Sequence, residues 1–210
     1  MTLRNRIFAI SKKLHLSHIG SAISTVTTVD AIYHVKKDNP FILSNGHAGM
    51  ALYVVLEKHL GLDAEKLFLE CGIHPKRSDY IFTSTGSLGC GLPIAVGYAL
   101  AGKPTYVTIS DGELYEGSIW EAFEIISQKN ITNLKMCLIF NGLSAYGTTD
   151  LSAIINKLRA FGMGVMLVKN ELKEIISALE LHTEVPVVII VQSSSDFKGY
   201  TGLKCHYQTL

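Results

Sequence analysis

The stretch TYVTISDGELYEGSIWEAFEIISQKNITNLKMCLIF, residues 105–140, decides the fold. An apolar run over Tyr106–Ile109 is followed by a helix-like segment over Ser118–Lys129 and a second apolar run over Leu134–Phe140. This succession predicts a β-α-β unit with two parallel strands.

The same alternation continues to the C-terminal side of this unit. It predicts a helix over Leu151–Phe161, a strand over Gly164–Val168, a helix over Glu171–His182 and a strand over Val187–Gln192. Repeated alternation of this kind is typical of a parallel sheet with helices on both faces and right-handed crossovers. We therefore expect an α/β fold in three layers, α/β/α, with a mostly parallel sheet.

The first hundred residues are more helical. Apolar residues recur three and four positions apart in four segments, Leu3–Leu14, Val26–Lys36, Gly49–Leu60 and Leu88–Ala101. Loops rich in Gly, Ser, Asn and His are predicted between them, at Ser17–Gly20, Ser44–His47 and Thr85–Gly89. Binding residues concentrate on such loops.

Composition narrows the class of partner. The 210 residues suit one globular domain over 1–210, with 48% hydrophobic residues and no visible linker. A formal net charge of +1 without blocks of like charge argues against nucleic acid or a membrane as partner, and favours a small ligand. The four cysteines form no C-x-x-C pair, which predicts reduced thiols and a cytoplasmic protein.

Polar side chains follow two consecutive strands of the predicted sheet. Asp111 follows the first strand and Asn141 the second, 30 residues later. Adjacent parallel strands would bring both side chains to one point, where ligands bind in such folds. A carboxylate, an amide oxygen and a backbone carbonyl suit Mg²⁺, although Asp-Gly after a strand is more often only a turn.

Several ordered motifs make a resemblance specific. They are DGELYEGSIWEA at 111–122, LSNGHA at 43–48, GSLGCGL at 86–92, His18–Ser21, His74-Pro75, and Lys198-Gly199 followed by His206. Together these motifs resemble those of the transketolase family over nearly the whole chain. The resemblance implies the thiamine diphosphate-binding fold, in its diphosphate-binding (PP-type) domain.

The resemblance also implies a metal and a cofactor site. Mg²⁺ would be held by Asp111, by the side chain of Asn141 and by the main-chain carbonyl of Leu143. Thiamine diphosphate would be bound by a larger set, His47, Gly86, Ser87, Leu88, Asp111, Gly112, Glu113 and Asn141. Ser110 and Ser17 stand where the family usually has glycine, and serine is small enough to keep both loops.

Catalytic roles follow from the same resemblance. His18, His47, His74 and His206 would face the reactive thiazolium ring and the sugar, where imidazole can exchange a proton near neutral pH. Glu116 resembles the family carboxylate that faces the partner chain. The remaining histidines, His15, His34, His59 and His182, match no motif and are expected at surface or satisfied core positions.

The expected function is that of one component of a two-chain enzyme. The family's pyrimidine-binding domain does not follow in this chain, so we expect it on a separately encoded C-terminal transketolase subunit, in an α2β2 assembly. The pair would transfer a two-carbon ketol unit from a ketose to an aldose, as sugars or sugar phosphates. The alternatives are the α subunit of a 2-oxo acid dehydrogenase or another carboligase, and a non-catalytic paralogue. The segments between His74 and Gly86 and between Ala101 and Asp111 are shorter than in full transketolases.

Overall fold

A parallel sheet lies at the centre of the computed structural model, which describes residues 1–196, 199, 201, 204–207 and 209. Its strands are β1 (Phe41–Leu43), β2 (Thr105–Ser110), β3 (Leu134–Phe140), β6 (Gly164–Lys169) and β7 (Val187–Gln192), in the order β1-β2-β3-β7-β6. Every pairing within the sheet is parallel. The three-layer prediction is confirmed, and β3 and β7 have the predicted bounds.

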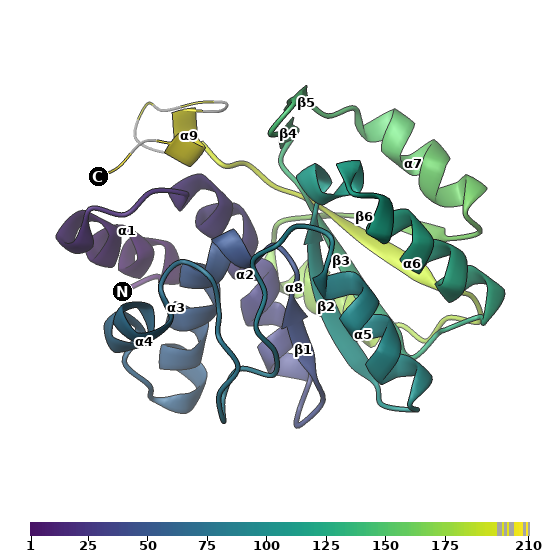
Figure 1. Ribbon diagram of the computed structural model, residues 1–210, viewed down its shortest axis with the longest axis horizontal. Helices are drawn as coiled ribbons and strands as arrows, with labels where there is room; N and C mark the ends of the chain where they lie inside the picture. The colour runs from purple at the N-terminus through teal and green to yellow at the C-terminus, as the bar shows by residue number, and fades with distance from the viewer. Residues whose placement is uncertain (197–198, 200, 202–203, 208, 210) are drawn as a thin grey trace.

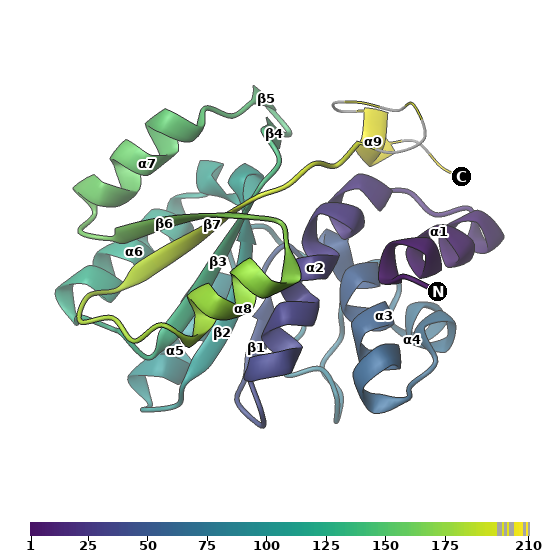
Figure 2. The same ribbon diagram turned by 180° about the vertical axis from the view of Figure 1, so that it is seen from behind.

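Helices cover both faces of the sheet (Figures 1 and 2). One face carries α5 (Gly91–Leu100), α6 (Gly117–Gln128) and α7 (Leu151–Ala160). The other carries α1 (Leu3–Leu14), α2 (Ile19–Val35), α3 (Gly49–Leu60), α4 (Ala64–Cys71), α8 (Leu172–Glu180) and, at its edge, α9 (Lys204–Tyr207).

Strand β3 shows why the strands of the sheet have continuous apolar sequences. Met136 and Leu138 belong to the core on the α5/α6 side, whereas Cys137 and Ile139 belong to the core on the α2 side. Successive side chains of a strand point to opposite faces. Because both faces are covered, neither set can be polar.

Helix α2 departs most from the prediction. It begins at Ile19, not at Val26, so residues 19–25 are helical where a loop and no helix were expected. Nearly every residue from Ile19 to Ile32 is buried between α1, α3, α8 and the sheet. A helix buried all round shows no single apolar stripe, which hides it from a search for amphipathic periodicity.

Smaller differences concern short elements. The sequence prediction omitted β1 and α4, and it started α5 three residues early, at Leu88. A strand of three residues carries too little alternation to be seen. Among the described residues, no helix combines the length and apolar character needed to cross a membrane.

Candidate functional site

The loops after β2 and β3 meet at the carboxyl edge of the sheet. The 3-10 helix η2 (Asp111–Tyr115) follows β2, and a hairpin of β4 (Leu143–Ser144) and β5 (Gly147–Thr148) follows β3. Figure 1 shows the hairpin above the carboxyl end of the sheet, at the end to which α6 turns its N-terminus. This is where an open parallel sheet binds ligands.

Asp111 joins the two loops. Its Oδ2 atom accepts hydrogen bonds from Gly142 N (2.9 Å), Leu143 N (3.2 Å) and Thr149 Oγ1 (2.7 Å). Its Oδ1 atom accepts one from Gly112 N (3.1 Å). The sequence predicted that these two loops would meet, and the structure brings them together.

Two of the oxygen atoms predicted to bind the metal, one from Asp111 and one from Asn141, lie close together. Leu143 N donates both to Asp111 Oδ2 and to Asn141 Oδ1, at 3.2 and 3.1 Å, so the two side-chain oxygens lie around one amide. Asp111 is 1% exposed, and burial raises its pKa to about 6 although four donors oppose the rise. A nearby cation would offset that cost. The donor set of hard oxygens therefore fits Mg²⁺.

Glu113 lies at a junction of three loops. It is fully buried, and its Oε1 atom accepts from Ser44 Oγ (2.5 Å) and Gly89 N (3.0 Å). Its Oε2 atom accepts from Ser110 N (2.9 Å), and burial raises the pKa of the carboxyl. With both oxygens occupied by protein donors, the side chain holds three loops together. These contacts indicate a positioning role, and a contact between Glu113 and the cofactor stays a prediction.

The loop of residues 44–48 and the loop of residues 85–89 both contain glycine, and they pack closely against each other. A Cβ on Gly46 would lie 2.8 Å from Gly86 N, and one on Gly89 would lie 2.6 Å from the Cβ of Glu116. Gly89 also has φ +80°, and Ser118 Oγ donates to its carbonyl at 2.9 Å. The backbone of residues 85–89 is thereby locked against the loop of η1 (Gly46–Ala48) and the start of α6.

Gly112 is different, because the protein itself does not require a glycine there. A Cβ at Gly112 would make only ordinary contacts, the nearest at 3.6 Å to Ser144. Beside the loop, Ser87 is exposed and Leu88 partly buried, and both are open to a ligand. The missing Cβ leaves room beside the Asp111 loop where a phosphate could approach the backbone.

Three of the four predicted histidines gather at the same edge. His18 precedes α2 in a left-handed conformation (φ 59°), and its ring centroid lies 5.9 Å from that of His47 in η1. Burial and the nearby His74 lower the pKa of His18. The ring of His74 in turn packs on Gly86. A Cβ added to Gly86 would lie 3.0 Å from Cγ of His74. Lys198 and the side chain of His206 lie outside the described residues.

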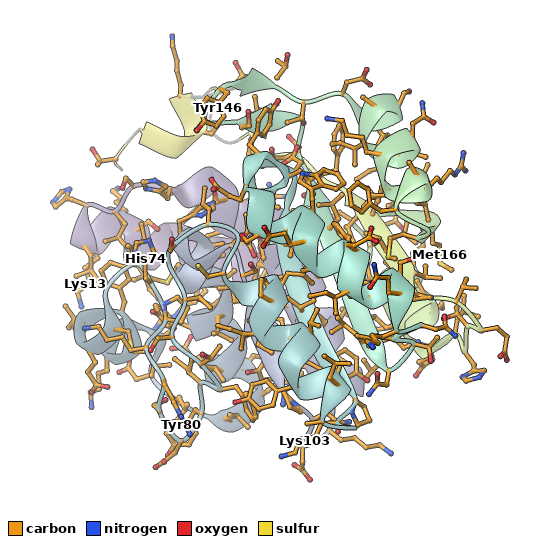
Figure 3. All side chains as sticks on the ribbon, turned by 45° about the vertical axis from the view of Figure 1, so that its right-hand side comes forward. Lys13, His74, Tyr80, Lys103, Tyr146 and Met166 are labelled. Atoms are coloured by element: carbon orange, nitrogen blue, oxygen red, sulfur yellow. The ribbon has the colours of Figure 1, made fainter. Side chains whose placement is uncertain are left out.

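Some contributing residues carried no recognisable signal. Thr149 binds Asp111, and Ser44 binds Glu113, but neither hydroxyl can be told from a turn residue by sequence alone. Exposed Tyr115 and Tyr146 pair across η2 and the hairpin with ring centroids 5.2 Å apart. Figure 3 places Tyr146 at this end of the molecule, above His74, with Tyr80 and Lys103 at the opposite end.

Fold and site together define an α/β ligand-binding domain whose hard-oxygen site lies at the carboxyl edge of parallel strands. The family model for the transketolase thiamine diphosphate-binding domain matches residues 24–195. The chain therefore belongs to the transketolase family of transferases.

Relatives of two lengths support this assignment. The chain is 33% identical to one of the subunits of apulose-4-phosphate transketolase from Phocaeicola vulgatus, over 82% of this chain and 72% of that one. It is 31% identical to the 6-deoxy-6-sulfo-D-fructose transketolase subunit SqwG of a Clostridium species, over 80% and 72%. Human transketolase is also 31% identical, but the match covers 78% of this chain and only 29% of the human one.

Solved structures give the same fold. Transketolase from Campylobacter jejuni superposes with a TM-score of 0.74 at 22% identity, over 91% of this chain and 37% of that one. A Pichia stipitis transketolase solved with sedoheptulose 7-phosphate gives 0.64 at 25% identity, over 83% and 36%. The chain thus spans little more than a third of these full-length enzymes.

Proposed function

We propose that this chain is the diphosphate- and Mg²⁺-binding subunit of a transketolase that transfers a two-carbon ketol unit between sugars. The observation that carries the proposal is the convergence of Asp111 and Asn141 oxygens on Leu143 N, beside the glycine loops. Family membership supports thiamine diphosphate as the cofactor. Magnesium is our inference from the donor set.

Each group of residues has a defined task in this proposal. Asp111, Asn141 and the carbonyl of Leu143 hold Mg²⁺, which in turn holds the diphosphate. Residues 86–88 and Gly112 line the cofactor with backbone and apolar contacts. The cofactor supplies the carbon–carbon bond chemistry when bound.

The histidines handle protons and substrate oxygens. His18, His47 and His74 converge from three different loops, so one sugar could meet all three. Because the pKa of His18 is lowered, its ring is neutral at pH 7 and can accept a hydrogen bond or a proton. His206 stays a prediction.

A second chain completes the active site in this proposal. Two relatives are named as transketolase subunits, and they are the ones of which this chain covers 72%. The partner would carry the pyrimidine-binding domain, in an α2β2 assembly, with Glu116 facing it. Substrates are sugars or sugar phosphates, and a cytoplasmic location stays a prediction.

Other functions are less well supported. An α subunit of a 2-oxo acid dehydrogenase would share the metal site, but the relatives described above are transketolases. A non-catalytic paralogue would bind the cofactor or a partner without turnover.

Co-purification with a candidate partner tests the proposal directly. The chain is co-expressed with a separately encoded pyrimidine-binding subunit, and ketol transfer is assayed with and without thiamine diphosphate and Mg²⁺. Activity that needs both chains, cofactor and metal is the expected result. A cofactor-loaded pair that turns over a 2-oxo acid and no ketose would favour the dehydrogenase. A pair without any turnover would favour the paralogue.

A further inference from the structure

A second polar cluster lies at the opposite end of the α2/α3 pair. Asp30 and His34 are one turn apart on α2, and His59 is on α3. One nitrogen of each histidine and one Asp30 carboxylate oxygen all lie within 4.8 Å of one another, and among the described residues this trio alone meets that condition for His, Cys, Asp and Glu.

The contacts within the cluster are close. His59 Nε2 lies 2.7 Å from Asp30 Oδ1, and His34 Nδ1 lies 3.7 Å from the same oxygen. The two imidazole rings meet edge to face, with centroids 4.9 Å apart. Ligands of a tetrahedral Zn²⁺ stand roughly 3.4 Å apart, given bond lengths of about 2.1 Å. To admit an ion, the His59 Nε2–Asp30 Oδ1 contact would have to open from 2.7 Å to about that spacing, and the His34 ring would have to turn Nε2 toward the ion.

Two further features favour a cation at this place. His34 Nδ1 lies 2.8 Å from the backbone carbonyl of Asp30, a contact that orients the ring and leaves Nε2 available, as in many metal-binding histidines. Helices α2 and α3 also end here, at Val35 and Leu60, and the C-terminal end of a helix dipole attracts positive charge.

The carboxylate of Asp30 is paired with Lys58. Its Nζ atom donates to both oxygens of Asp30, at 2.8 and 2.7 Å. Asp30 is 8% exposed at its side chain, but Lys58 is 42% exposed and can withdraw into water. An arriving dication would thus compete with a mobile ammonium for a carboxylate that stays in place.

We propose that Asp30, His34 and His59 form a binding site for Zn²⁺ or a similar transition-metal ion, separate from the Mg²⁺ site. Two imidazoles and one carboxylate are ligands that suit zinc, with water or a further group in the open position. The ion would link α2 to α3. These helices begin immediately after His18 and two residues after His47, so the link would stiffen the elements that carry two predicted catalytic histidines.

Metal titration of the 210-residue chain tests the site. The chelator-stripped protein is kept in excess Mg²⁺, so that the hard-oxygen site is occupied. Co²⁺ is then followed by its visible absorption, and Zn²⁺ affinity is measured against a chromophoric chelator. One saturable site per chain is expected, together with a higher Tm in Zn²⁺ that is lost in the ligand variants.

Matched variants locate the ion. H34Q and H59Q should each weaken Zn²⁺ binding by at least about 100-fold, since even an outer-shell partner is worth roughly 10–100-fold. H182Q removes a histidine whose side chain is 87% exposed and which lines the same surface pocket as His34 without belonging to the trio, and it should leave the affinity unchanged. K58Q removes the competing ammonium and should tighten binding several-fold.

Three results would overturn the proposal. The first is the absence of saturable Co²⁺ and Zn²⁺ binding. The second is equal affinity in H34Q, H59Q and H182Q, which would place the ion elsewhere, for instance among His18, His47 and His74. The third is a loss in K58Q as large as that in H34Q, which would identify the cluster as an ion-pair network only. None of these outcomes bears on ketol transfer, so the proposed function stands or falls separately.

Discussion

Two regions of the molecule each hold a buried aspartate, Asp111 at the carboxyl edge of the sheet and Asp30 near the C-terminal end of α2, but the partners of these aspartates differ in charge. Asp111, at the carboxyl edge of the sheet, is bound by three amides and a hydroxyl, all neutral. Asp30, at the far end, is bound by the ammonium of Lys58 and the imidazole of His59. A buried carboxylate with neutral donors still lacks a compensating charge, whereas one with its own cation does not. The first end therefore lacks a compensating charge that a bound cation could supply. The second is compensated by Lys58 in the absence of zinc, and the proposed ion would have to displace that ammonium.

The largest expected effect is loss of the metal at the neutral-donor end. Asp111→Asn keeps one oxygen for its hydrogen-bond donors but removes the negative charge that Mg²⁺ needs. Mg²⁺-dependent affinity for thiamine diphosphate should fall by at least about 100-fold. That is more than the loss expected for a residue that only hydrogen-bonds to a metal ligand. Calorimetry with and without Mg²⁺ measures it, with exposed Asp38→Asn as the control. Unchanged affinity in Asp111→Asn would remove this residue from the metal site.

Glu113 tests whether the same end is also held together internally. Glu113→Ala leaves the donors of Ser44, Gly89 and Ser110 without their buried acceptor. We expect the free energy of unfolding to fall by at least about 3 kcal/mol, because each of the three donors left unpaired costs roughly 1–3 kcal/mol. Urea unfolding measures the change. Exposed Glu121→Ala on α6 should stay within about 0.5 kcal/mol of wild type, and an equal effect of the two variants would refute the positioning role.

A substitution of Asp30 should have a smaller effect, and the effect should be on stability alone. Asp30→Asn removes the carboxylate of the ion pair with Lys58, which is partly exposed. A buried pair would lose about 3–5 kcal/mol and an exposed one under about 1 kcal/mol, so about 1–2 kcal/mol is expected in the absence of added zinc. Thermal and urea unfolding against Asp38→Asn measure it. A stability gain would show that burying this pair is unfavourable.

The smallest effect concerns pH. The pKa of His18 is lowered by burial and by His74, so the unfolded chain takes up this proton at a higher pH than the folded chain. The associated stability is complete above the unfolded pKa of about 6.5 and declines as pH falls through that value toward the folded pKa. His18→Asn should flatten this part of the curve of unfolding free energy against pH, since Asn tolerates the left-handed conformation. Parallel curves for the two proteins would contradict the assignment.

Much of the architecture was visible in the pattern of apolar residues. The apolar runs that became β2 and β3 are long enough to carry their own signal, and the polar residues that follow them located Asp111 and Asn141 at one edge. Helix α2 was misjudged because a helix buried on all sides has no polar face. The burial of Glu113 was not foreseen, because nothing in the neighbouring sequence reveals whether a carboxylate points outward or into a loop junction.

By itself, the sequence determined the parallel α/β fold, the family and the meeting of the Asp111 and Asn141 loops. Strand order along the chain and motif spacing carry that information locally. Only the tertiary structure decided the role of Glu113 and the meeting of Asp30 with His59, which are 29 residues apart on two helices. Such contacts depend on how the helices are rotated and packed against each other. That rotation is set by the whole core and by no single stretch of sequence.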